Sequence, residues 1–351
     1  RAKTLDLLGQ RLTQVQLQVT PSQNNWIIDI SSPEVAGEIV APVNLTPQGS
    51  ISAQFQKLNL QAATGTQTRP AIDVKSLPSI SFTANNVSYN AIPFGQVAFK
   101  TAPSGSGMSI RTLRITSSRM DLQASGAWTQ SNTTSLQGVI KSSNVSNLLN
   151  SLGFDVHNFV SSNGRLDFSL SWHDAPFAPS VASLSGNASL DMGKGRIVEV
   201  SQTSGAKMDL GRMLSIFSLQ TIPRRLMFDF SDVFQKGYSF DYVRGDFRFD
   251  NGNAFTNNLR FEGPIAAVGI HGRIGLKNKD YDFTLSVTPH VTSSIPVAAT
   301  LITGNPVVGL AAMAVNTVIS SGVSKATSYY YAVTGSWDNP SWKSISVPAR
   351  D

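Results

Sequence analysis

The sequence predicts a mainly β fold in which a long, curled antiparallel sheet forms an open groove. Apolar and polar residues alternate in nearly every segment of residues 224–287, and a period of two indicates strands with one apolar and one polar face. Turn signals such as Asn251-Gly252 separate these runs, because glycine accepts a positive φ without steric cost. Only 14% of the 351 residues are charged, against roughly 25% in typical soluble domains.

The first 70 residues predict a short helix followed by strands and a loop. Residues 4–8 favour the helix, and alternation begins at Gln14. Further strands are predicted around residues 26–30 and 51–55. Residues 61–70 combine polar side chains with Gly and Pro, which is typical of a flexible loop.

Residues 80–141 predict five strands that recur about every ten residues. In the fourth, Leu122, Ala124 and Trp128 share a face opposite Asp121 and Gln123. The five predicted ranges are 80–88, 95–101, 108–116, 119–128 and 134–141.

Two short helices are expected to interrupt the strands. Residues 144–152 and 208–220 both carry apolar residues at helical spacing. The first is interpreted as a crossover or lid. The strand of Leu166, Phe168 and Leu170 lies between them.

Residues 291–324 differ from the rest because they contain no charged residue. Asn305-Pro306 is a typical helix start, and the predicted helix from Val307 to Ile319 is apolar almost all round. It is shorter than the roughly 20 residues that span a bilayer. Residues 295–303 predict a shorter partner helix, and Tyr329 to Thr334 a closing strand. The apolar helix residues are Val307, Val308, Leu310, Met313, Val315, Val318 and Ile319.

Composition excludes several classes of site. The chain has no cysteine, so disulfides, thiolate metal sites and cysteine nucleophiles are ruled out. A net charge of +6 without a Lys/Arg cluster argues against nucleic-acid binding. The four histidines are scattered, without metal-ligand spacing, so neither a metal nor a cofactor is expected. The acidic residues are interpreted as strand-surface and turn carboxylates, since they lack the spacing of a calcium loop; they are Asp229, Asp232, Asp241, Asp246 and Asp250.

Periodicity alone leaves open what covers the apolar face. It could be the core of a closed barrel or sandwich, or the lining of a groove. A long sheet cannot leave an apolar face in water, because such patches rarely exceed a few hundred Å². The few helices offer little cover, so the sheet must curl on itself or hold an apolar ligand. The expected lining residues are Leu122, Leu166, Phe168, Leu170, Val243, Phe247, Phe249, Val268, Ile270, Phe283 and Leu285.

The residues after Arg224 carry a family resemblance. Arg224-Arg225-Leu226 precedes the run from Phe228 to Phe234, and Gly263-Pro264-Ile265-Ala266 and the run from Tyr331 to Trp337 follow. This pattern resembles the C-terminal region of the AsmA-like family, above all its YhdP-type members. The resemblance covers most of the chain and is most specific over 190–290. It agrees with a continuous β-groove over residues 1–290, followed by an apolar helical segment with a closing strand over 291–351.

The resemblance implies a non-enzymatic lipid conduit. Such proteins are β-grooves that cross the Gram-negative periplasm and move phospholipid between the inner and outer membranes. The chain would then be the part near the outer membrane, and a segment that precedes Arg1 would anchor it to the inner membrane. Its partners would be phospholipid and either the inner leaflet of the outer membrane or an outer-membrane protein.

Two further interpretations stay open beside the conduit. The chain could instead be a structural or assembly module of the cell envelope that binds an outer-membrane partner through an edge strand. The apolar helices after residue 291 could plug the end of the sheet or dock on the membrane.

Overall fold

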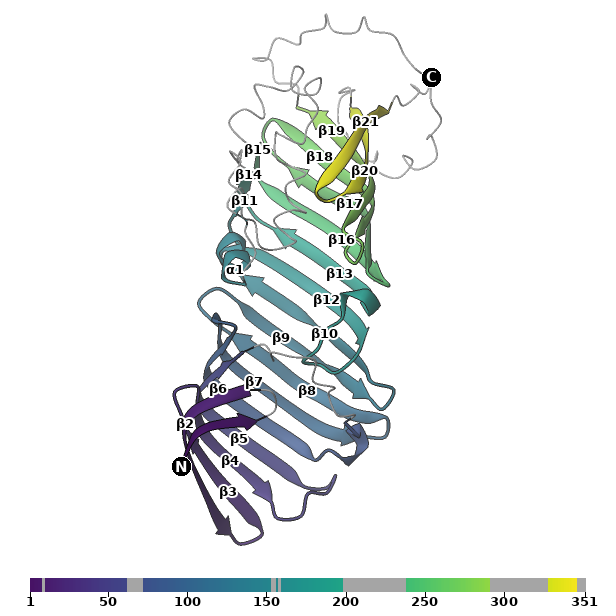
Figure 1. Ribbon diagram of the computed structural model, residues 1–351. Coiled ribbons are helices and arrows are strands. Elements are labelled where there is room, and N and C mark those ends of the chain that lie inside the picture. The colour runs from purple at the N-terminus through teal and green to yellow at the C-terminus, as the bar shows by residue number, and fades with distance from the viewer. Residues whose placement is uncertain are drawn as a thin grey trace, which may run out of the picture. The chain divides into compact units, whose positions relative to one another are not determined.

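The computed structural model describes residues 1–7, 10–61, 72–152, 156, 159–197, 238–290 and 328–345. Strands dominate this part of the chain, so the predicted mainly β class is confirmed (Figure 1). The chain divides into two compact units. Unit 1 comprises residues 1–143, 147–153 and 165–186, and unit 2 comprises residues 144–146, 154–164 and 187–351.

Unit 1 is built on an open ladder in which each strand from β1 to β10 pairs with the next. All five strands predicted between residues 80 and 141 are present, as β6 to β10. The strands are β1 Ala2–Leu7, β2 Gln10–Ser22, β3 Asn25–Ser31, β4 Val35–Pro42, β5 Ser50–Leu60, β6 Ser79–Tyr89, β7 Ile92–Ser104, β8 Gly107–Thr116, β9 Asp121–Thr129, β10 Thr133–Ser142 and β12 Gly164–His173.

One pair in this ladder breaks the predicted antiparallel pattern. β5 and β6 run parallel, with Ile51 opposite Ile80 and Ala53 opposite Phe82. Parallel neighbours need a connection of a dozen residues or more, because the chain must return to the same end of the sheet. The stretch between Leu60 and Ser79 is long enough for that return.

The helix predicted for residues 4–8 is wrong. Residues 4–7 belong to β1, which pairs antiparallel with β2 from Ala2 opposite Val15 to Leu7 opposite Gln10, and Leu8 lies outside the described residues. A five-residue helix is unstable in isolation, so pairing with the neighbouring strand decides its conformation. The helix predicted for residues 144–152 is present as α1, Val145–Ser151. Two single-turn 3-10 helices, Val74–Ser76 and Val181–Ser183, lie in loops of unit 1.

Unit 2 contains a six-stranded antiparallel ladder and a small sheet. The ladder runs in sequence order through β16 Tyr242–Asp250, β17 Asn253–Glu262, β18 Ala266–Gly275, β19 Asp280–Pro289, β20 Tyr329–Ser336 and β21 Asn339–Ile345. The small sheet pairs β11 Phe159–Ser161, β14 Gly195–Ile197 and β15 Tyr238–Phe240. β13, Ser185–Met192, lies across the division between the units. The Asn251-Gly252 turn is confirmed, since both residues have positive φ, 47° and 81°.

Several predictions lie outside the described residues. These are the loop over 61–70 beyond Gln61, the helix over 208–220, and the apolar helical pair over 295–319 with its seven named residues. Within the described ranges, α1 is the one α-helix.

Gly126 offers a test of the close packing between β9 and β10. A Cβ on Gly126 would overlap the carbonyl oxygen of Ser135, whereas one on Gly105 would meet no atom within 4 Å. We expect Gly126→Ala to destabilise unit 1 by about 1–3 kcal/mol, as overpacking does. Gly105→Ala should stay within about 0.5 kcal/mol of the parent. Urea unfolding of both variants measures this difference, and equal stabilities would contradict the register.

Candidate functional site: the apolar face of unit 1

The register of unit 1 aligns apolar residues into two rows that cross nine strands. The Val19 row consists of Val19, Ile28, Ile39, Ala53, Phe82, Phe99, Leu113, Ala124 and Gly138. The Leu17 row consists of Leu17, Ile30, Gly37, Phe55, Ala84, Val97, Ile115, Leu122 and Ile140. No member of either row has a polar side chain. Together the two rows form a continuous apolar face from β2 to β10.

The opposite face of the same strands is mostly polar. Between the two apolar rows, seven of the nine intervening register positions are polar, namely Gln18, Asp29, Glu38, Gln54, Thr83, Arg114 and Gln123, and the other two are Ala98 and Val139. Successive residues of a strand point to opposite faces, so these side chains face away from the apolar rows. The sheet of unit 1 therefore has one apolar face and one mostly polar face.

The apolar face is only partly covered. Of the eighteen row positions, Ile30, Ala53 and Ala84 are buried, and most others are half-buried. Leu17 and Val19 are 49% and 50% exposed. Packed cores of this size leave few apolar side chains half-exposed. The face thus has the accessible apolar surface that a lipid-holding groove requires.

An aromatic cluster lies in the middle of this face. The rings of Phe82 and Phe99 stack with centroids 4.7 Å apart, and Phe55 lies 5.7 Å from Phe82. Offset and stacked ring pairs fix the orientation of their side chains. The face therefore has a preorganised aromatic centre rather than loose aliphatic chains.

Loop residues enclose one edge of the face. Val74 and Ala175 come from loops and pack with Met108 and Trp128 in one buried cluster. The Trp172 indole donates to the Ala175 carbonyl at 3.1 Å, and the Thr134 hydroxyl donates to the Asp174 carbonyl at 2.7 Å. These bonds fix the loop against the strands, so the loop covers this edge of the face in a defined conformation.

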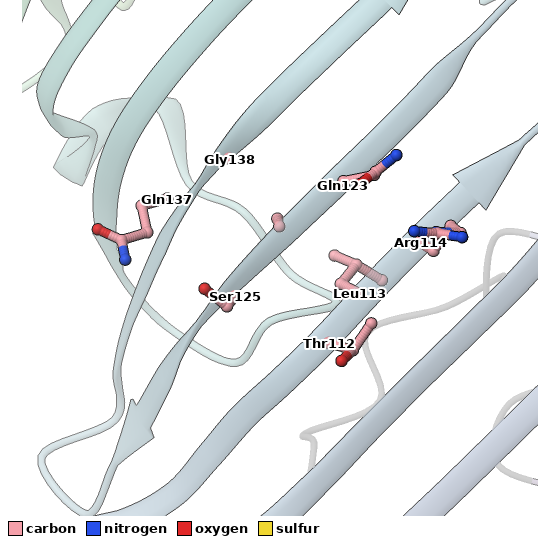
Figure 2. Close-up of a pocket in the computed structure, with 8 residues that line it drawn as sticks. Thr112, Leu113, Arg114, Gln123, Ser125, Gln137 and Gly138 are labelled. Atoms are coloured by element: carbon pink, nitrogen blue, oxygen red, sulfur yellow. The ribbon is translucent and has the colours of Figure 1, made fainter.

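A shallow hollow of about 450 Å³ lies over β8, β9 and β10 (Figure 2). Leu113, Ala124 and Gly138 of its lining occupy one stretch of the Val19 row. The other lining residues, Thr112, Arg114, Gln123, Ser125 and Gln137, alternate with the row residues along their strands, so the hollow is not confined to the apolar face.

The apolar face of unit 2 is different because much of it is buried. Val243 is fully buried, and Phe283 is 5% exposed. Val268, Ile270 and Leu285 are also buried. These residues have the environment of a packed core.

Several charged residues in the described part of unit 2 pair with charged or polar neighbours. Arg273 donates to both oxygens of Asp280, at 3.0 and 2.7 Å, and this hydrogen bonding lowers the pKa of Asp280. Hydrogen bonds from Ser189 and Asn258 lower the pKa of Asp246 in the same way. Burial raises the pKa of the Tyr238 hydroxyl, which donates to the Ala266 carbonyl at 2.8 Å. Such pairs are structural, and in the described part of the chain no three His, Asp or Glu residues gather as metal ligands.

A known protein family also matches the sequence of this chain. A sequence profile of the YhdP family, described as "YhdP protein", matches residues 1–342. The chain belongs to the YhdP family. This membership confirms the AsmA-like, YhdP-type resemblance seen in the sequence.

One relative within the YhdP family is "Intermembrane phospholipid transporter YhdP" of Escherichia coli (strain K12). It is 24% identical over 350 residues, which cover 97% of this chain and 27% of the relative. The chain thus spans about a quarter of the length of that relative. No solved structure matches the chain. No helix in the described ranges is long and apolar enough to cross a membrane.

The lining residues predicted from the sequence fall into two groups in this YhdP-family chain. Leu122, Leu166, Phe168 and Leu170 of unit 1 are half-buried, as are Phe247 and Phe249 of unit 2. Val243, Val268, Ile270, Phe283 and Leu285 are buried. The predicted lining does not include the row residues of β2 to β8, although alternation in each of these strands was the available signal.

Proposed function

We propose that this chain is a segment of a phospholipid conduit and that the apolar face of unit 1 holds the acyl chains. The observation that carries the proposal is the pair of apolar rows that cross nine strands and stay half-exposed. Each Å² of apolar surface removed from water favours uptake by about 25 cal/mol. Headgroups would stay in water at the edge of the sheet, while hydrocarbon contacts the rows.

The proposal needs no chemistry within the chain. Lipid movement along a face without polar side chains requires only exchange of one hydrocarbon contact for another. Membership of the YhdP family and the likeness to the intermembrane phospholipid transporter of E. coli support this proposal. By the same analogy the segment works in the periplasm, between an inner-membrane anchor and the outer membrane. The apolar stretch after residue 291 is proposed as the part that contacts the outer membrane.

Photo-crosslinking tests the proposal. Benzoylphenylalanine in place of Phe99 should label co-purified phospholipid, because Phe99 lies in the Val19 row. The same probe in place of Lys100, which is exposed on the opposite face, should label at background level. Native mass spectrometry should show retained phospholipid. Lipid-free protein together with equal labelling at both positions would contradict the proposal.

A second candidate function is an assembly module that pairs with a partner strand. The last seven residues of β2, Gln16–Ser22, pair with β3 on one side and are all exposed, and unpaired strand edges are templates for β-augmentation. This candidate predicts a stable protein complex without lipid. The crosslinking experiment therefore separates the two functions.

A further inference from the structure

β2 changes its pairing partner part-way along its length. Residues 10–15 pair with β1, whereas residues 16–22 pair with β3. Gln14 lies at this change and has a φ of 49°, a conformation that only a few per cent of non-glycine residues adopt. We call β1 together with Gln10–Val15 the strap.

The strap lies on the apolar face of unit 1 (Figure 1, purple). Leu12 and Val15 are 3% and 2% exposed, and they form one cluster with Ile30 and Val35. Phe55 packs against this cluster. Since Ile30 and Phe55 belong to the Leu17 row, the strap covers a part of the face that is otherwise half-exposed.

Polar bonds at the rim hold the strap in place. The Thr13 amide and hydroxyl donate to the two carboxylate oxygens of Glu34, at 2.9 and 2.7 Å. Ser32 accepts from the Glu34 amide at 3.2 Å, which fixes the turn that carries the carboxylate. Gln10 donates to the Gln61 carbonyl at 2.8 Å and accepts from its amide at 2.6 Å. These contacts are directional, whereas the contacts of Leu12 and Val15 are not.

We propose that the strap occupies an acyl-chain position over β3 to β5 and is displaced when a lipid chain enters there. This inference rests on the proposed function. Leu12 and Val15 present branched hydrocarbon to Ile30 and Phe55, and a lipid tail would present the same chemistry. Exchange of one hydrocarbon for another changes little apolar area, so the polar bonds at the rim decide which occupant is favoured, and Thr13–Glu34 is the charge-assisted one among them.

The test uses photo-probes at two row positions, Phe55 beneath the strap and Phe99 outside it. Glu34→Gln removes the carboxylate and should raise phospholipid labelling at position 55 roughly tenfold, the effect of losing one charge-assisted hydrogen bond. The matched control Glu38→Gln makes the same charge change at an exposed position on β4 and should change nothing. Labelling at position 99 should be equal in all forms.

A locked form completes the test. The chain has no native cysteine, so Thr13→Cys with Glu34→Cys can be joined by a short bis-maleimide. Before joining, this variant should label at position 55 like Glu34→Gln; after joining, labelling there should fall to background. Equal labelling at position 55 in joined and unjoined protein, with position 99 still labelled, would overturn the strap inference alone. Loss of labelling at position 99 in every form would contradict the proposed function as well.

Hydrogen exchange gives a readout without a probe in the apolar face. Added phospholipid should speed amide exchange in residues 10–15 of the parent protein and leave it unchanged in the joined form. Unchanged exchange in the parent, at lipid concentrations that label position 99, would overturn the inference.

Discussion

Leu113→Asp is expected to stop lipid from occupying the middle of the apolar face. Leu113 lies directly between Phe99 and Ala124 in the Val19 row. A carboxylate placed against hydrocarbon costs about 2.5–3.5 kcal/mol, which corresponds to roughly a hundredfold loss of occupancy. Phospholipid labelling from a probe at Phe99 should fall by that factor.

The folded structure should survive this change, because Leu113 is only half-buried and an aspartate there can reach water in the lipid-free protein. Gln123→Asp is the matched control, since it adds the same charge on the exposed polar face of the adjacent strand. Parent-like labelling in the control, together with an unchanged unfolding midpoint in both variants, isolates the effect on lipid. Full labelling in Leu113→Asp would exclude the Val19 row as the lipid path.

Truncation of one phenylalanine in each unit should separate a packed core from a ligand-binding face. Phe283 is buried in unit 2, so Phe283→Ala leaves a cavity and should cost about 3–5 kcal/mol. Phe99 is half-buried in unit 1, so Phe99→Ala should cost about 1 kcal/mol in the lipid-free protein.

Urea unfolding, followed by hydrogen exchange in each unit, measures both free energies of unfolding. The units need not unfold together, so each is followed by its own amides. Similar costs for the two variants would mean that the apolar face of unit 1 is filled by the chain itself. That result would remove the main physical argument for lipid binding.

Local sequence patterns predicted the strands and turns well because they depend on neighbouring residues. Alternation around Leu122 located β9, and Asn251-Gly252 located a hairpin because its positive φ values favour these residue types. The segment at residues 4–8 failed for the opposite reason, since its partner strand decides its conformation.

The candidate site could be predicted only in part. Alternation shows that Phe99 and Phe283 each lie on an apolar face, but not what covers that face. Phe99 proved half-buried and Phe283 buried. The sequence of one strand does not show which residues of the next strand lie opposite it. The alignment of Val19 with Gly138 through seven intervening strands could therefore not be predicted. The parallel pairing of β5 with β6 was missed because a polar linker gives no sign of the direction in which the chain returns.

The length of the Val19 row bears on how many molecules the segment can carry. Neighbouring strands lie about 4.8 Å apart, so a row across nine strands extends over roughly 38 Å. One leaflet of a bilayer contributes only about half of the roughly 30 Å hydrocarbon thickness. If tails lie along the row, at least two of them fit end to end. Lipid molecules would then bind one behind another along the row. The mass of the loaded protein would rise in discrete steps, one lipid at a time.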